Sequence, residues 1–153
     1  MESEIRKPTD ADVEYIVNNI RQADADEIEA LDGKTIKEVF DEMPNLKEIS
    51  DVWVVDGKPC CIYGVTPHPE DSKVGVIWMI AAEGFHKHSK FFGLRCKPYV
   101  EKLLDGYDYV FNYIHTKNRV SIQWLEWLGF TIHEPDLVGY KGETFSRFEY
   151  KNV

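Results

Sequence analysis

Residues 74–82 (VGVIWMIAA) constrain the fold of this chain most, because they are apolar at successive positions and so on both faces of an extended strand. A strand of this kind lies in the middle of a sheet that is covered on both sides. The chain has 153 residues, which is enough for one domain with one hydrophobic core. We therefore expect a single α/β domain over residues 1–153, with residues 74–82 as a central strand.

Helical patterns precede this strand. A helix that Thr9 or Asp10 caps carries one apolar stripe, and an acidic segment over residues 24–31 follows it. The stripe consists of Val13, Ile16, Val17 and Ile20. Thr35 and Glu38 have the spacing of a capping box and predict the start of a third helical segment. The first third of the chain is thus predicted to be mainly helical.

Strand patterns surround the helices. Ile5 indicates a short first strand, and Asp56-Gly57 is a hairpin signal between residues 52–55 and 60–65. A second turn over residues 67–71 leads into the central strand. Sequential strands joined by such turns are antiparallel, so these strands should form an antiparallel sheet.

The second half alternates helices and strands. One helical face is predicted from Phe92, Cys96, Tyr99, Val100 and Leu103, in a helix that Pro98 bends. A strand over residues 108–114, a helix over 118–128 and two strands over 130–133 and 144–150 follow. A helix joins the strands at 74–82 and 108–114, so they should be parallel with a right-handed crossover.

Composition excludes several classes of function. The net charge of -9 disfavours nucleic acid as a partner, because phosphate binding needs a basic surface. No apolar run approaches the ~20 residues that span a bilayer, so we expect no membrane partner. Three cysteines without C-x-x-C spacing and scattered histidines predict no disulfide framework and no metal site.

Residues 118–130 (NRVSIQWLEWLGF) resemble a pattern of the Gcn5-related N-acetyltransferases, or GNAT family. In that pattern an Asn follows the fifth strand and begins a short helix, which a Leu-Gly-Phe closes. Val110, Asn112 and Ile114 alternate in the preceding strand, and the order of elements also follows the family. The resemblance implies a GNAT-like mixed sheet with antiparallel N-terminal strands, a central splayed parallel pair and flanking helices.

A closer resemblance is to the internal virion (core) protein A family of short-tailed bacteriophages. It covers about residues 74–134 and rests on Trp78, Phe91 or Phe92, the Asn112-Tyr113 pair and Asn118. This resemblance implies a phage protein made in the host bacterial cytoplasm, and an association with the virion.

The GNAT resemblance implies acetyl-CoA or another acyl-CoA as cofactor. In that fold the edge of the fourth strand pairs with pantetheine like an added strand, and the next helix start faces the pyrophosphate. The residues that correspond here are Ile80, Ala81, Ala82, His86, Lys87, His88, Ser89 and Lys90, together with Asn118. The family's glycine-rich turn is replaced by HKHSKFFG, so a basic helix start with Phe91 and Phe92 as core anchors is the alternative. Asn118 has capping of its helix as its alternative.

Acyl transfer also needs an acid and a base. Leu125 stands where the family often has a Tyr, so Tyr113 is the candidate acid, and Glu83 is the candidate base. Asn112 either contacts a ligand or satisfies backbone groups that splayed strands leave unpaired.

Two functions follow from the resemblances. The first is a phage N-acyltransferase that moves an acyl group from acyl-CoA to an amine on a host or phage protein or a small molecule. The second is a catalytically degenerate GNAT-fold protein that serves in phage particle assembly or binds a host factor. The last strands of this fold type often pair between subunits, which is compatible with a homodimer.

Overall fold

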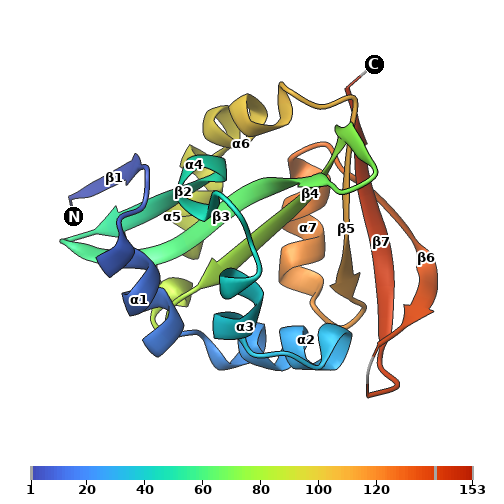
Figure 1. The fold of residues 1–153 in the computed structure, drawn as a ribbon, viewed down its shortest axis with the longest axis horizontal. Coiled ribbons are helices and arrows are strands. Elements are labelled where there is room, and N and C mark those ends of the chain that lie inside the picture. The colour runs from blue at the N-terminus through green and yellow to red at the C-terminus, as the bar shows by residue number, and fades with distance from the viewer. Residues whose placement is uncertain (1, 140, 153) are drawn as a thin grey trace. The chain divides into compact units, whose positions relative to one another are not determined.

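The computed structural model describes residues 2–139 and 141–152. Within these residues, a short first strand and four helices come first, three strands follow, and helices and strands are mixed in the rest of the chain (Figure 1). The strands are β1 (Ser3–Arg6), β2 (Ser50–Val55), β3 (Lys58–His68), β4 (Asp71–Ala81), β5 (Tyr109–His115), β6 (Thr131–Val138) and β7 (Thr144–Lys151). The helices are α1 (Asp10–Asn18), α2 (Gln22–Asp32), α3 (Ile36–Asp41), α4 (Leu46–Ile49), α5 (Ser89–Arg95), α6 (Lys97–Leu104) and α7 (Arg119–Trp127), with a 3₁₀ turn at Phe85–Lys87.

The strands of this part of the chain form one mixed sheet in the order β1-β2-β3-β4-β5-β7-β6. β1 with β2 and β2 with β3 are antiparallel, whereas β4 with β5 is parallel, as the helical connection between them predicts. β7 inserts between β5 and β6 and is antiparallel to both. The predicted α/β class with a parallel pair inside a mixed sheet is confirmed.

The chain divides into two compact units. The first unit comprises the chain up to Gly64 together with Trp78–Lys90, and the second comprises Val65–Ile77 and the chain from Phe91 onward. The prediction of a single domain over residues 1–153 stays a prediction.

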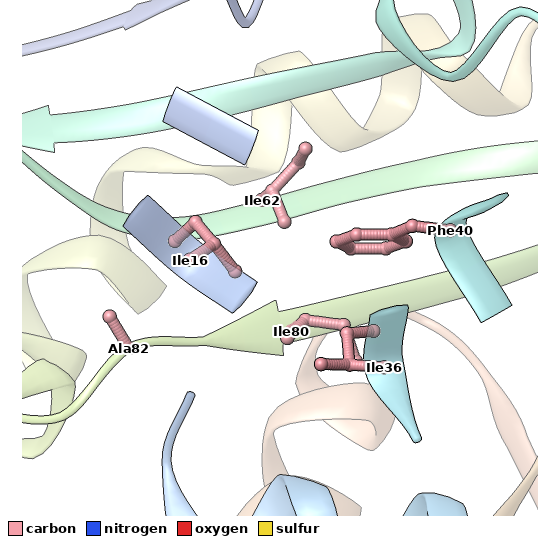
Figure 2. Close-up of a cluster of buried hydrophobic side chains, with 6 residues drawn as sticks. All are labelled: Ile16, Ile36, Phe40, Ile62, Ile80 and Ala82. Carbon is pink, nitrogen blue, oxygen red and sulfur yellow. The ribbon is translucent and has the colours of Figure 1, made fainter. Parts of the chain in front are cut away.

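The core of the first unit lies between α1, α3 and the sheet. Figure 2 shows Ile16 of α1 and Phe40 of α3 beside Ile62 of β3 and Ile80 of β4. Ile16 and Ile62 have no exposed surface. The other residues of the predicted stripe, Val13, Val17 and Ile20, are partly buried against this cluster, and Ile20 lies beyond the end of α1. Trp78 packs against this cluster, with its ring 5.8 Å from that of Phe40.

Local signals set the helix ends in this unit. Thr9 caps α1 in a capping box with Asp12, and Thr35 caps α3 in a capping box with Glu38. Gly33 ends α2 with a φ of 68°, in the left-handed region that favours glycine. The short helix α4 was not predicted.

The second unit contains α5 from Phe91 onward, the helices α6 and α7, the strands β5, β6 and β7, and the parts of β3 and β4 within Val65–Ile77. Phe92, Cys96, Val100 and Leu104 are buried, and their spacing of four residues places them along one side of α5 and α6. Tyr99 is 44% exposed, so its predicted place on the buried face is wrong. The predicted single bent helix is two helices, because α5 ends at Arg95 and Pro98 occupies the first turn of α6.

Candidate functional site

The parallel pairing of β4 with β5 is short. It covers Val74 to Val76 on β4 and Tyr109 to Phe111 on β5, whereas β5 stays paired with β7 as far as His115. In a parallel ladder alternate residues bond to the same neighbour, so Gly75 is followed by Ile77 on this edge of β4. The next direct hydrogen bond would join the Tyr113 N–H to the Ile77 carbonyl.

The side chain of Asn112 takes the place of that bond. Its amide Nδ2 donates to the Ile77 carbonyl at 2.5 Å, and its Oδ1 accepts from the Tyr113 N–H at 2.7 Å. One side-chain amide therefore satisfies both backbone groups where the ladder stops. This is the second of the two roles that the sequence left open for Asn112; its role as a ligand contact stays a prediction.

The far end of β4 is covered by the chain that joins α1 to α2. We call residues 19–24, which are this connection together with the first turn of α2, the strap. The Arg21 N–H donates to the Ala81 carbonyl at 2.8 Å, the Glu83 N–H donates to the Asn19 carbonyl at 2.8 Å, and Ile20 forms an antiparallel bridge with Ala82. The Ala82 N–H points the other way, to the Cys60 carbonyl of β3. The strap therefore lies on the edge of β4 that faces away from β3.

Asp24 bonds the N–H group of Ala81, the residue whose carbonyl accepts from Arg21. Its Oδ2 accepts from the Ala81 N–H at 2.6 Å, and its Oδ1 pairs with Arg21 Nη2 at 2.6 Å. Asp24 is buried, and this burial raises the pKa of its carboxyl above the ordinary value, although Arg21 and the Ala81 N–H act in the opposite direction. Both backbone groups of Ala81 are therefore bonded inside the protein.

Met79 is the residue left between these two positions. Ile77, Met79 and Ala81 alternate along β4, so their backbone groups point to the same edge. Asn112 covers the carbonyl of Ile77, and the strap covers Ala81. An added strand pairs with successive alternate residues, and here Met79 lies alone between two occupied positions.

Glu83 sits beside the strap. Its side chain is exposed, and its Oε1 accepts from the Gln22 N–H at 3.1 Å at the start of α2. This bond satisfies one of the open N–H groups of the helix. Its predicted role as a base stays a prediction, and its geometry is that of a helix cap.

The basic turn predicted to face the pyrophosphate is anchored by aromatic rings. Phe85 is buried, and the ring of Trp53 lies 6.2 Å from the rings of Phe85 and His88. His86, Lys87 and Lys90 are exposed, and Ser89 Oγ donates to the His86 carbonyl at 3.2 Å. The exposed basic side chains of the turn and of the start of α5 are therefore His86, Lys87 and Lys90, whereas His88 packs on Trp53.

The helix after this turn has a crowded start. α5 has seven residues, SKFFGLR, with Phe91 and Phe92 in its first turn. Phe92 is buried 6.2 Å from the ring of Trp124, and the Arg95 guanidinium lies 4.5 Å above the ring of Phe91. The alternative that the sequence left open, a helix start whose rings act as anchors, describes Phe92.

The remaining candidates lie in the second unit. Asn118 caps α7, because its Oδ1 accepts from the Ser121 N–H at 3.3 Å. Tyr113 is half-buried edge-on to Phe111, on the opposite face of β5 from Asn112. Leu125 is buried, so the position of the family's Tyr is part of the core.

The cysteines offer no nucleophile. Cys61 and Cys96 are buried, and Cys60 is partly buried. Burial raises the pKa of Cys96 to about 11, which keeps it a neutral thiol at neutral pH. In the described part of the chain, no group of three His, Cys, Asp or Glu side chains is placed to hold a metal ion. No described helix is long and apolar enough to cross a bilayer.

Sequence reasoning missed Arg21 and Asp24, the two residues with the most direct effect on the edge of β4. Asp24 looks like any acidic residue in a first helical turn, where carboxylates favour the helix dipole. It differs from exposed Asp26 in its burial, which a single sequence does not show.

The fold is that of the GNAT acetyltransferases. A ribosomal-protein-alanine N-acetyltransferase from Brucella melitensis matches with a TM-score of 0.75 and 14% identity, covering 97% of this chain and 99% of that one. A Gcn5-related N-acetyltransferase from Kribbella flavida matches with a TM-score of 0.71 and 15% identity, covering 97% of each chain. A GNAT-family acetyltransferase from Streptococcus pneumoniae has a TM-score of 0.69 and 14% identity, covering 98% and 99%. No family model and no curated protein matches the sequence.

Acyl-CoA, which this fold implies, does not fit the residues present. Pairing with pantetheine would use the backbone of Ala81, and Arg21 and Asp24 already occupy both of its groups. The first turn of α5 also has Phe91 where the family has a small residue.

Proposed function

We propose that this chain uses the GNAT fold as a binding module and not as an acyl-CoA-dependent transferase. The observation that carries the proposal is the closed edge of β4, where the strap bonds both backbone groups of Ala81. Asp24 is buried together with Ala81, so opening this edge would expose a buried carboxylate bond and break an ion pair.

The other positions support the same proposal. The candidate base Glu83 caps α2, the candidate ligand contact Asn112 bonds two backbone groups, and Leu125 is buried where an acid is expected. The module's proposed place is phage particle assembly or the binding of a host factor, in the host bacterial cytoplasm or in the virion. That part rests on the resemblance of residues 74–134 to internal virion proteins.

Calorimetry with acetyl-CoA tests the proposal. A ligand that binds only the folded state at 100 times its Kd stabilises that state by about 2.7 kcal/mol, which a thermal shift detects readily. We expect neither heat nor a shift at millimolar acetyl-CoA. Binding together with release of free CoA in the presence of amines would overturn the proposal.

A second candidate is acyl transfer from acyl-CoA to an amine. The match to acetyltransferase structures over nearly the whole chain favours it. It requires the strap to leave Ala81, with Glu83 and Tyr113 in the roles predicted from the sequence. Asp24→Ala removes the carboxylate that holds the Ala81 N–H, so acetyl-CoA binding that appears only in this variant would favour a transferase held closed by the strap.

A further inference from the structure

The first unit also has a groove between α1, α3 and α4, which is lined by none of the residues on the edge of β4. This open groove has a volume of about 680 Å³, within the range of pockets that bind ligands. Its floor is apolar, with Val13 and Val17 from α1, Phe40 from α3 and Leu46 from α4. Val13, Val17 and Leu46 are only partly buried although they pack against the core cluster.

The rim of the groove is acidic. Its carboxylates are Asp10, Glu14, Asp41 and Glu48. Two lysines lie among them, and each is already paired: Lys47 with Asp10 at 2.8 Å, and Lys37 with Asp41 at 2.8 Å. Glu14 of α1 and Glu48 of α4 are exposed and are the surplus negative charge of the lining.

We propose that this groove docks a basic polypeptide segment in which an apolar side chain is flanked by Lys or Arg. The apolar residue would cover Val13, Val17 and Leu46, and its cationic neighbours would meet Glu14 and Glu48. A second copy of this chain is a poor occupant, because the net charge of -9 makes two copies repel each other. The inference rests on the proposed function, since it names the class of partner that the binding module takes.

The length of α1 sets the size of the segment. α1 has nine residues and lines the groove from Asp10 to Asn18, so the groove runs for about 13 Å along the helix. An extended chain covers this distance with about four residues. A six-residue peptide therefore fills the groove and leaves a charged residue at each end.

The test uses fluorescence anisotropy with the labelled peptide KRLFKR and the full chain at near-physiological salt. Two further peptides are compared with it: KRSSKR, which lacks the apolar anchor, and EELFEE, which reverses the charge. We expect KRLFKR to bind and the other two to bind at least about tenfold more weakly, because both the anchor and the charges contribute.

Charge-reversal variants locate the binding site. Glu14→Lys with Glu48→Lys should weaken binding of KRLFKR about tenfold or more. The matched control is Glu101→Lys with Glu126→Lys, which changes the net charge equally at exposed positions on α6 and α7 and should leave binding within about twofold. Circular dichroism of both double variants checks that they are folded.

Several results would overturn the docking proposal. They are equal binding of KRLFKR and KRSSKR, equal loss in the two double variants, or wild-type binding after Glu14→Lys with Glu48→Lys. Sedimentation that shows a dimer which only the groove variant dissociates would make a second copy the occupant. If neither the peptide nor acetyl-CoA binds, the docking proposal is overturned and the proposed function stands. Acetyl-CoA turnover with intact peptide binding overturns the proposed function alone.

Discussion

Asp24→Ala is the substitution that most directly tests the closed edge of β4. The change removes the acceptor of the Ala81 N–H, and Ala81 has no exposed surface, so water does not replace the bond. A buried N–H left without a partner costs about 1–3 kcal/mol. Arg21 also loses its carboxylate partner, but its side chain is 28% exposed, so the ion pair adds only a screened contribution of about 0–1 kcal/mol. We expect Asp24→Ala to destabilise the fold by about 2–3 kcal/mol.

Asp24→Asn is the matched control. The asparagine keeps an oxygen for the Ala81 N–H and almost the same shape, but it presents an amide to Arg21 in place of a carboxylate oxygen. Its expected cost is therefore smaller, about 1 kcal/mol. Urea unfolding measures both variants, with an m-value of about 2 kcal/mol/M for a domain of this size. The midpoint should fall by about 1–1.5 M in Asp24→Ala and by about 0.5 M in Asp24→Asn.

The pH dependence gives an independent check on Asp24. Burial raises the pKa of its carboxyl, so the folded state holds this proton more tightly than the unfolded chain does. The stability that the proton contributes is fully present below the ordinary pKa of 3.8 and is lost as the pH rises through the higher folded pKa. The stability of the wild type relative to Asp24→Asn should decline over that window.

In the urea experiment, an Asp24→Ala midpoint within about 0.2 M of the wild-type midpoint would refute the account of the closed edge.

Three further predictions concern other positions. Asn112→Ala should cost about 1–3 kcal/mol in urea unfolding, because the Ile77 carbonyl and the Tyr113 N–H both lose their partner; an unchanged midpoint would contradict the bridging role. Gly64→Ala should cost about 1–3 kcal/mol in thermal unfolding, because its Cβ would lie 2.6 Å from the Ile49 carbonyl oxygen, and a neutral result would refute the crowding. Burial alone would raise the pKa of Asp12, but hydrogen bonds from Arg6 and Thr9 hold this pKa below its ordinary value. The charged Asp12 therefore contributes stability to the folded state that is present above pH 3.8 and is lost as the pH falls through the folded pKa. Asp12→Asn should thus flatten the acid limb of the stability curve, and a limb as steep as that of the wild type would count against the pairing.

The elements set by local chemistry could be predicted from the sequence. Thr9 and Thr35 begin helices because each forms a capping box with a carboxylate three residues later. The Thr hydroxyl accepts from the backbone N–H of the acidic residue, and the carboxylate accepts from the backbone N–H of the Thr. Asp56 and Gly57 both adopt positive φ, of 49° and 82°, as a tight hairpin between twisted strands requires. These signals depend on neighbours within four residues, so one sequence contains them in full.

The exposure of single helix residues and the order of the last strands depend on tertiary contacts, which the sequence pattern does not show. Tyr99 shares a helical period with Phe92 and Cys96, yet it is exposed, because the residues that are buried after Cys96 are Val100 and Leu104, which continue a spacing of four. The place of β7 between β5 and β6 also lies outside local pattern, since it depends on pairing between strands that are distant in the sequence. Period alone does not resolve such choices.

The bonds along β4 explain how a fold can match acetyltransferases over nearly its whole length while its cofactor edge differs. Apolar positions such as Ile16, Ile62 and Ile80 specify the fold, and many sequences satisfy them, which agrees with identities near 15%. An open strand edge, in contrast, exists only while no side chain or backbone of the protein bonds to it. Asp24 lies 57 residues from Ala81 in the sequence, so a search along the strand itself would pass over the carboxylate that bonds its N–H. Whether the Ala81 backbone is open to a ligand therefore depends on the polar side chain of Asp24, which lies outside the strand itself.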